Sequence, residues 1–339
     1  MITVSHMSMR EQESNEPVQP NAAETSRPTA ASMPTPVVAV VLAAGFGTRF
    51  DPANPKQLVS IASKPIVCWS IEAFESCDAV TDILVVVNPQ VRGEVERLVD
   101  EAGYPKVRMI IDGGAERVDS TACALQALAD AGIPPHAKLL IHDAVRPFVA
   151  QSSIRGCVDA LDQFDAATVA CASTDTMLLT RDLGDRKVIE SVPDRAAMFR
   201  AQTPQAFRFE TIRHAYDLAA GDPDFHPTDD TRVVVDYMPD TPVAIVAGSE
   251  TNLKITTRAD LPIAERIAAQ RAGGSGADGV GGGAGVDGGI GFGGEAGIGG
   301  GADVVDAAES DDDRPLTKEE VRARMHALFA QARAQTRGR

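Results

Sequence analysis

Two basic side chains, Arg49 and Lys56, lie on and just beyond a small-residue turn that ends a run of β-forming residues. The turn, residues 43–47, reads Ala-Ala-Gly-Phe-Gly. Glycines let a backbone approach a ligand and expose its N–H groups, so such a turn with Arg and Lys beside it is suited to holding phosphates. It is not a Walker A loop, and it lacks the third glycine of the dinucleotide fingerprint. The alternative interpretation is a tight turn between a strand and a helix.

A second candidate is segment 112–120, Asp-Gly-Gly-Ala-Glu-Arg-Val-Asp-Ser, which follows an expected strand. Its two glycines open a backbone that can approach the edge of a base. Ser120 supplies a hydroxyl at the start of an expected helix. The same hydroxyl could instead only cap that helix.

A third candidate is segment 142–147, His-Asp-Ala-Val-Arg-Pro, directly after another expected strand. Phosphoryl transfer needs a divalent ion to neutralise the phosphate oxygens, and a carboxylate at a strand end is a suitable tether for that ion. We therefore predict Asp143 as the metal ligand. Arg146 either forms an ion pair that shapes the loop or contacts a second substrate. His142 is interpreted as a structural histidine.

Four later segments carry further polar groups. Thr176 and Arg195 offer a hydroxyl and a guanidinium, and arginine binds phosphate through a bidentate fork. Thr203 precedes a proline that restricts the chain before a new helix, and a rigid turn without a ligand role is the alternative. Lys254 lies in an apolar segment, where an ammonium is costly unless it finds anions. It is therefore a candidate phosphate-side or metal-side cation, with an ordinary lysine that extends to solvent as the alternative.

The elements that position these residues alternate between strands and helices. The expected strands are 37–42, 82–88, 107–112, 138–142, 166–172 and 242–247, and the expected helices are 64–76, 92–102, 120–131, 152–161 and 258–270. This alternation predicts an α/β fold with a mainly parallel sheet and helices on both faces. In such sheets ligands bind beyond the carboxyl ends of the strands, where most of the motifs lie. Residues 173–200 break the rhythm and are expected to leave the main sheet.

The motifs, in this order across residues 37–269, resemble those of polyol-phosphate cytidylyltransferases, above all the family that activates 2-C-methyl-D-erythritol 4-phosphate in non-mevalonate isoprenoid synthesis. The resemblance implies a Rossmann-like sheet of the nucleotide-diphospho-sugar transferase type. It also implies transfer of CMP from CTP to the polyol phosphate with release of pyrophosphate, and Mg²⁺ as cofactor. The implied homodimer is formed through a protruding β-arm at about 173–200.

The resemblance also implies roles for individual residues. The catalytic cations are Arg49, Lys56 and Lys254. The nucleotide-binding residues are Ala43, Ala44, Gly45, Gly47, Gly114, Ala115, Ser120, Asp143 and Ala144. The residues for the substrate phosphate are Thr176, Arg195, Arg146 and Thr203, and Asp143 holds the metal. The family often has Asp where this chain has Ala115, but recognition of cytosine through backbone groups is compatible with either residue.

One departure leaves the acceptor open. Many methylerythritol-phosphate enzymes have a basic residue two places after the phosphate-binding Thr, whereas residues 176–179 here read Thr-Met-Leu-Leu. Cytidylyltransferases that use D-ribitol 5-phosphate often lack that basic residue too, so ribitol phosphate is the alternative acceptor. Another base in the nucleotide, or a non-catalytic nucleotide-binding scaffold, are the remaining alternatives.

Composition limits the partners and the compartment. The net charge of −16 argues against a nucleic-acid-binding surface. No apolar run is long enough to span a bilayer, and no secretory signal is found at the N-terminus. Five scattered cysteines without Cys-x-x-Cys spacing predict reduced thiols in a cytoplasmic protein.

The flanking segments differ in composition from the α/β region at 36–271. Residues 1–35 are polar and are expected to be a disordered arm. Residues 272–313 are rich in Gly and Asp and are expected to form a flexible linker. Residues 314–339 contain a capping-box signature and an apolar stripe, which predict an amphipathic C-terminal helix.

Overall fold

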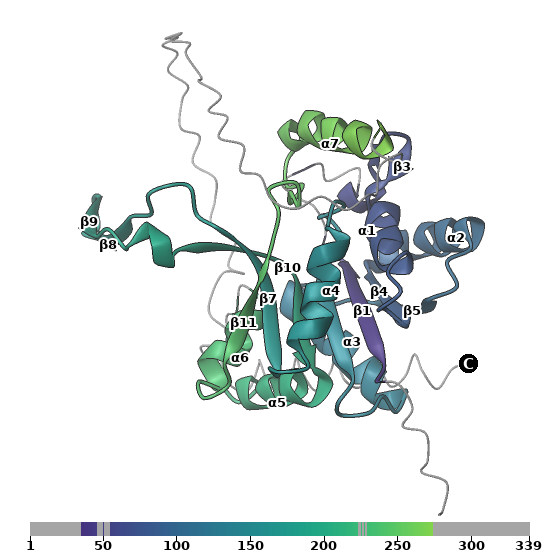
Figure 1. The fold of residues 1–339 in the computed structure, drawn as a ribbon, viewed down its shortest axis with the longest axis horizontal. Helices are drawn as coiled ribbons and strands as arrows, with labels where there is room; N and C mark the ends of the chain where they lie inside the picture. The colour runs from purple at the N-terminus through teal and green to yellow at the C-terminus, as the bar shows by residue number, and fades with distance from the viewer. Residues whose placement is uncertain are drawn as a thin grey trace, which may run out of the picture. The chain divides into compact units, whose positions relative to one another are not determined.

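The computed structural model describes residues 35–273 apart from 46–49, 51–54, 223, 224, 226 and 228, and its main element is a seven-stranded sheet (Figure 1). From edge to edge the strands are β11 (Val243–Ala247), β7 (Ala166–Ala172), β10 (Phe199–Arg208), β6 (Lys138–Asp143), β1 (Val37–Ala43), β4 (Asp82–Val87) and β5 (Val107–Asp112). Neighbouring strands are parallel except at β10, which runs antiparallel to β6 and β7. The predicted α/β class with a mainly parallel sheet is confirmed.

Helices cover both faces of this sheet. One face packs against α1 (Ile66–Glu75), α2 (Arg92–Ala102) and α4 (Gln151–Ala160), and the other against α3 (Arg117–Asp130), α5 (Phe209–Ala219) and α6 (Asp230–Tyr237). A strand between two helical layers must be apolar on both faces. In β1, Ala39 and Val41 pack into the first cluster and Val38 and Val40 into the second. The continuous apolar run of β1 therefore fits a central strand that is covered by helices on both faces.

Helix α3 begins three residues earlier than the predicted 120–131 helix. Glu116 is its N-cap and forms a capping box with Asp119, in which each side chain accepts a hydrogen bond from the backbone of the other residue. Ser120 lies inside the first turn, where its Oγ donates to the Glu116 carbonyl at 3.1 Å. The prediction that Ser120 starts or caps the helix is wrong, because an acidic pair provides the cap.

The segment that contains Thr203 and Pro204 is part of β10 and not the rigid turn considered above. A proline cannot donate to the ladder of hydrogen bonds in a sheet and is confined to edges or irregularities. Here the pairing of β10 with β7 changes register between Ala201 and Gln205, and the pairing with β6 includes Gln205 but not Pro204. The irregularity lets a proline lie within a central strand, and α5 follows directly after β10.

Phe199 and Arg200, the last two residues of the predicted excursion, belong to β10 and pair with β7. As predicted, the preceding residues 173–198 leave the main sheet. They contain a separate hairpin of β8 (Leu179–Asp182) and β9 (Lys187–Ser191), which extends away from the sheet in Figure 1. A second small hairpin pairs β2 (Ser60–Ile61) with β3 (Lys64–Pro65), and this hairpin occupies the start of the predicted 64–76 helix. Helix α7 (Leu261–Gly273) follows a 3₁₀ turn at Arg258–Asp260 and packs in a third apolar cluster around Phe148 and Ile255.

Several expectations concern residues outside the described ranges. They are the N-terminal arm up to residue 34, the Gly/Asp-rich linker from residue 274 onward, the C-terminal helix, and the positions Gly47 and Arg49. Within the described ranges no helix has the length and apolar character needed to cross a membrane. All five cysteines are described and unpaired, which agrees with the expected reduced thiols.

Candidate active site

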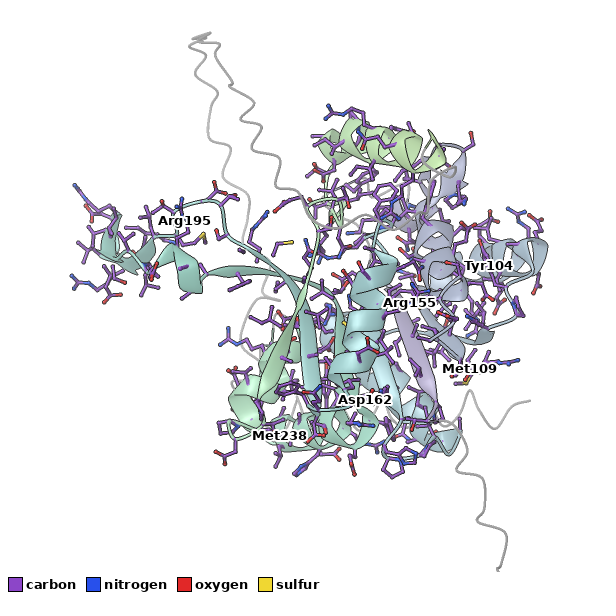
Figure 2. All side chains as sticks on the ribbon, viewed as in Figure 1. Tyr104, Met109, Arg155, Asp162, Arg195 and Met238 are labelled. Carbon is purple, nitrogen blue, oxygen red and sulfur yellow. The ribbon has the colours of Figure 1, made fainter. Side chains whose placement is uncertain are left out.

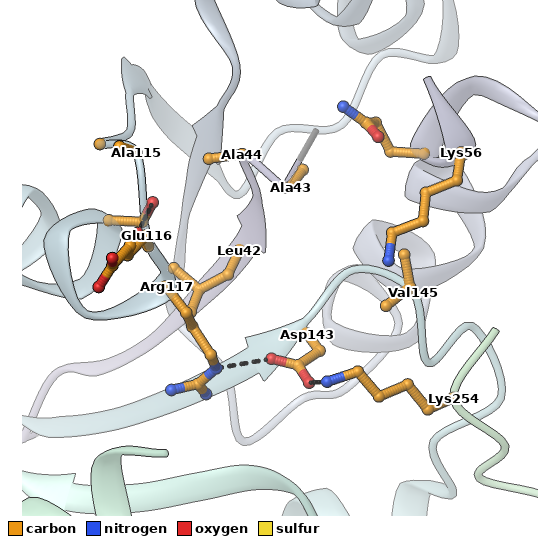
Figure 3. Close-up of a pocket in the computed structure, with 14 residues that line it drawn as sticks. Leu42, Ala43, Ala44, Lys56, Ala115, Glu116, Arg117, Asp143, Val145 and Lys254 are labelled. Atoms are coloured by element: carbon orange, nitrogen blue, oxygen red, sulfur yellow. Dashed lines mark hydrogen bonds and ion pairs between the residues drawn. The ribbon is translucent and has the colours of Figure 1, made fainter. Parts of the chain in front are cut away.

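A pocket opens at the carboxyl ends of β1 and β6, beside the loop that follows β5 (Figure 3). In the sheet, β1 has β4 on one side and β6 on the other, so the chain order reverses at this point. Such switch points are where ligands bind in open α/β sheets. The pocket is lined by Leu42, Ala43, Ala44, Gly45, Lys56, Gln57, Gly114, Ala115, Glu116, Arg117, Ser120, Asp143, Val145 and Lys254.

Asp143, the last residue of β6, lies opposite Leu42 of β1 and is the acidic centre of the pocket. Its Oδ1 accepts from Arg117 Nε at 3.0 Å, and its Oδ2 accepts from Lys254 Nζ at 2.9 Å. Arg146 Nε is 4.0 Å from Oδ2. Burial acts to raise the pKa of the Asp143 carboxyl, but Arg117 and Lys254 outweigh burial and hold this pKa well below its ordinary value. Asp143 is therefore a carboxylate at neutral pH.

Behind Asp143, a hydrogen-bonded chain fixes the backbone. Thr203 Oγ1 accepts from the Asp143 N–H at 3.1 Å and lies 2.9 Å from His142 Nδ1. His142 Nε2 lies 3.0 Å from the Arg146 carbonyl, which can only accept, so Nε2 carries the proton and Nδ1 accepts from Thr203. Burial is the main reason that the pKa of His142 is lowered to about 4. The neutral, fully buried ring agrees with the structural role predicted for His142.

Arg117 connects the pocket to the helical layer on one face of the sheet. Its Nη1 donates to Asp230 Oδ2 at 2.7 Å, while its Nε holds Asp143. Asp230 is the first residue of α6 and has no exposed surface. Its Oδ1 accepts from the Tyr216 hydroxyl at 2.6 Å, and its N–H donates to Gln205 Oε1 at 3.0 Å. A continuous polar chain thus runs from α5 and α6 to the floor of the pocket.

The loop that carries Lys254 is anchored on both sides of the lysine. Asn252 is buried, and its Nδ2 donates to Gln202 Oε1 at 3.1 Å and to the Thr203 carbonyl at 2.9 Å. On the other side, the Ile255 N–H donates to the Val145 carbonyl at 2.8 Å. The backbone at Lys254 is therefore held in place on both sides, whereas the Lys254 side chain is 42 % exposed.

The loop after β5 is shaped by close packing at its two glycines. A Cβ on Gly113 would lie 2.5 Å from Cβ of Ala44 and 2.7 Å from Oγ of Ser120. A Cβ on Gly114 would lie 2.2 Å from Cβ of Asp119. Both glycines therefore let the loop lie against β1 and the first turn of α3, which puts the Gly114–Ala115 backbone in the pocket wall.

The structure brings together most of the predicted residues and separates the others. Those in the pocket wall are Ala43, Ala44, Gly45, Lys56, Gly114, Ala115, Ser120, Asp143 and Lys254. Gly47 and Arg49 lie outside the described residues. Among the remaining predictions, Ala144, Arg146 and Thr203 lie next to Asp143 without lining the pocket, and Thr176 and Arg195 lie on the arm.

The three residues next to Asp143 have protein partners. Ala144 is fully buried, its N–H donates to the Leu42 carbonyl, and its carbonyl accepts from Ser70 Oγ. Arg146 Nη1 donates to the Asn252 carbonyl at 2.9 Å, so its guanidinium ties the Lys254 loop to the Asp143 loop. This geometry supports the loop-shaping alternative for Arg146.

On the arm, Arg195 Nη1 donates to the Thr174 carbonyl at 3.4 Å, which brings the two predicted phosphate-binding segments together. Figure 2 shows Arg195 on the arm, away from the side chains packed around the sheet. Within one chain the described structure therefore separates Arg195 from the pocket.

The sequence did not single out Arg117 or Asp230 as site residues. Arg117 lies within the 112–120 segment, and Asp230 lies 113 positions further along the chain. An arginine beside a loop of two glycines was the available signal for Arg117. Nothing in the sequence pairs it with Asp230, because their contact depends on how α6 docks on the sheet.

The charges define what the pocket can bind. Lys56, Arg117 and Lys254 line it as cations, and Glu116 and Asp143 line it as anions. Figure 3 shows the Lys56 side chain directed into the space that also contains Asp143 and Lys254. A site with three cations, loop backbone in its wall and a buried carboxylate is suited to a polyphosphate.

Three comparisons relate the chain to known proteins. A family model described as 2-C-methyl-D-erythritol 4-phosphate cytidylyltransferase matches residues 37–270. The enzyme of that name from Bifidobacterium longum strain DJO10A is 64 % identical over 318 residues, which are 94 % of each chain. The bifunctional ribulose 5-phosphate reductase/CDP-ribitol pyrophosphorylase of Haemophilus influenzae is 36 % identical over 235 residues, which are 69 % of this chain and 48 % of that protein.

Among solved structures, the 4-diphosphocytidyl-2C-methyl-D-erythritol synthase of Anaerococcus prevotii superposes with a TM-score of 0.60. The match covers 69 % of this chain and 96 % of that one at 24 % identity, which is evidence for the fold alone. The family model matches about two thirds of the chain, and the Bifidobacterium longum enzyme is 64 % identical over 94 % of both chains. These two findings show the family. The chain belongs to the 2-C-methyl-D-erythritol 4-phosphate cytidylyltransferase family.

Proposed function

We propose that this chain transfers CMP from CTP to 2-C-methyl-D-erythritol 4-phosphate, giving 4-diphosphocytidyl-2-C-methyl-D-erythritol and pyrophosphate. The observation that supports this reaction most is the convergence of Lys56, Lys254 and Asp143 on one pocket beside two backbone loops. The Ala43–Gly45 turn and the Gly114–Ala115 loop are suited to the triphosphate and the cytosine, respectively. Arg49 belongs to the same proposal through its place in the motif.

The reaction is a single in-line displacement. An oxygen of the methylerythritol phosphate forms a bond to the α-phosphorus of CTP while the bond from that phosphorus to the bridging oxygen breaks, and the electron pair leaves with pyrophosphate. No general base is required, because a phosphate monoester is largely a dianion at neutral pH. Both reactants are anions, so the protein must offset their repulsion and hold them in line. Lys56 and Lys254 supply positive charge, and the rigid loops supply orientation.

The residues of the pocket fit a magnesium ion that enters with the nucleotide. Mg²⁺ is commonly held by one or two carboxylates together with substrate phosphates, and the described residues contain no cluster of three or more His, Cys, Asp or Glu side chains for a site made by protein alone. Asp143 would hold the ion, which neutralises phosphate charge when it is bound. Lys254 pairs with Oδ2 of Asp143, and its ammonium would turn toward the phosphates if the ion took its place at that oxygen.

The acceptor site is proposed to be completed by a second subunit. Thr176 and Arg195 are exposed on the arm and belong to no part of the pocket within one chain. The arm also exposes large apolar side chains, among them Leu179 and Ile189. An arm that packs against a second copy would bury these side chains and bring its threonine and arginine to the substrate phosphate of that copy. We also propose that the enzyme is a homodimer and that it acts in the cytoplasm.

Pyrophosphate release tests the reaction. Purified protein with CTP and Mg²⁺ is assayed with methylerythritol phosphate and, in parallel, with D-ribitol 5-phosphate, while ATP, GTP and UTP replace CTP in further reactions. We expect release with CTP and methylerythritol phosphate. The apolar residues after Thr176 and the similarity to a CDP-ribitol pyrophosphorylase make ribitol phosphate the second candidate, and faster release with it would replace the first. Binding of CTP without release with either acceptor would indicate a non-catalytic protein.

A further inference from the structure

We propose that Arg117 is a positioning residue that reserves Oδ1 of Asp143 and leaves Oδ2 as the oxygen that exchanges partners during the reaction. The inference rests on the proposed function, because it concerns how the same carboxylate changes partners. Arg117 Nε is 3.0 Å from Oδ1, and Lys254 Nζ is 2.9 Å from Oδ2. The two oxygens of one carboxylate therefore have two different cationic partners.

The two partners differ in how firmly they are held. Arg117 is tied at its other end to Asp230 at 2.7 Å, and its side chain is 23 % exposed. Lys254 is 42 % exposed, and its ammonium forms an ion pair with Asp143. A guanidinium held by two carboxylates keeps its position, whereas a single ammonium near solvent can move at lower cost. Lys254 is thus the exchangeable partner, and Arg117 is the fixed one.

Asp230 makes Arg117 a fixed partner rather than a free pocket cation. Asp230 has no exposed surface, and it is itself held by the Tyr216 hydroxyl and by Gln205. Because Asp143 and Asp230 flank the guanidinium of Arg117, the positive charge that this residue presents to an incoming triphosphate is partly offset. Its effect is on the direction in which Asp143 presents its second oxygen. Partners that orient a metal-binding side chain in this way typically contribute 10- to 100-fold in metal affinity or activity.

Calorimetry of CTP binding, in EDTA and in Mg²⁺, separates positioning from simple charge. The first variant is Arg117→Gln, which loses the ion pairs with Asp143 and Asp230. The second is Arg117→Lys, which keeps the positive charge but not the two separate nitrogens that contact these carboxylates. For Arg117→Gln we expect the CTP affinity in EDTA to stay within about threefold of that of the original chain. The factor by which Mg²⁺ increases the CTP affinity, here called the Mg²⁺ gain, should fall about 10-fold or more. We expect kcat to fall by a similar factor with little change in KM. Arg117→Lys should recover only part of either loss.

Arg92→Gln is the matched control. Arg92 also bridges two acidic residues, Glu96 and Asp112, and its side chain is 26 % exposed, but it does not line the pocket. This control should keep both the Mg²⁺ gain and kcat. Equal losses in Arg92→Gln and Arg117→Gln would overturn the inference, because they would report general destabilisation.

Asp230→Asn decides the question if the Arg117 variants do not fold, as circular dichroism would reveal. It leaves Arg117 in contact with Asp143 but weakens the anchor, so we expect a loss in the Mg²⁺ gain of about 10-fold. A folded Asp230→Asn protein with the full gain would overturn the inference. The proposed function fails separately, when the unaltered chain releases no pyrophosphate.

Discussion

The pocket and the arm differ in which side chains they bury and which they expose. In the pocket, Asp143 is buried, its partners are charged, and every contact is made within one chain. In the arm, the β8–β9 hairpin exposes apolar side chains, and Ile189 is 60 % exposed. A two-stranded hairpin without a core is only marginally stable in water. The difference supports the proposal that one subunit forms the nucleotide site, whereas the arm packs against a second copy.

The comparison separates the two substrates. Under the proposed function, the residues assigned to CTP line the pocket at the ends of β1 and β6, whereas Thr176 and Arg195, assigned to the polyol phosphate, lie on the arm. Variants of the pocket should therefore affect the chemical step, while variants of the arm should affect association and the use of the acceptor. The following predictions test this division, starting with the largest expected effect.

Asp143→Asn should have the largest effect. The amide keeps the shape of the side chain but removes the charge that holds Arg117 and Lys254, so we expect turnover to fall roughly 10³-fold. Pyrophosphate release under saturating CTP and acceptor measures the loss. Asp162→Asn is the control, because Asp162 also pairs with a lysine, Lys138, but lies outside the pocket. A loss of less than tenfold in Asp143→Asn would argue that the carboxylate is not part of the chemistry.

Lys56→Ala should reduce turnover by roughly 10²-fold, which is the scale for loss of one electrostatic donor in an active site. The physical reason is that the lysine side chain lines the pocket and offsets charge on the triphosphate. Steady-state kinetics with CTP measures the effect. Lys106→Ala is the matched control, since Lys106 Nζ donates to the Cys77 carbonyl away from the pocket. Near-normal turnover in Lys56→Ala would remove Lys56 from the site.

On the arm, Ile189→Glu should disrupt association and not the fold. A charge at this position opposes burial against a second copy, so we expect a monomer in analytical ultracentrifugation. We also expect a KM for the acceptor that is roughly 10-fold higher or more, because contacts to its charged phosphate are lost. Val235→Glu is the control, since Val235 of α6 is 51 % exposed but lies outside the arm. A dimer with unchanged KM in Ile189→Glu would contradict the role given to the arm.

His142→Gln should have the smallest effect and should change how stability depends on pH. Burial lowers the pKa of His142 to about 4, compared with about 6.5 in an unfolded chain. Between these values the unfolded chain binds more protons, so stability is full above about pH 6.5 and falls as the pH drops toward 4, by up to about 3 kcal/mol. Urea unfolding in metal-free buffer should show a shallower fall for His142→Gln. The exposed His136→Gln control should keep the slope, and an equal slope in both variants would contradict the prediction.

The sequence predicted the sheet and much of the pocket because both depend on local patterns. Apolar runs in β1 and β6 mark strands covered on two faces, and Asp143 follows such a run directly. Lys56 and Lys254 were found because a lysine next to a glycine turn or in an apolar segment needs an anion. These inferences use only neighbours in the chain, so they did not require knowledge of the packing.

The features that the sequence did not predict depend on long-range contacts. The strand β10 was missed because a proline argues against a central strand, and the register shift that accommodates Pro204 depends on β7. Arg117 and Asp230 were missed because their contact forms only when α6 packs on the sheet. Whether Thr176 and Arg195 act on the substrate of a second subunit depends on a surface that no single chain specifies.

The central claim is that Lys56, Lys254 and Asp143 converge on the triphosphate of CTP. A crystal structure of the chain with CTP and Mg²⁺ tests it most directly. We expect the triphosphate between Lys56 and Lys254, with Lys254 moved away from Asp143 while Arg117 remains on Oδ1. A nucleotide bound elsewhere, or bound in this pocket with both lysines directed away from its phosphates, would contradict the claim.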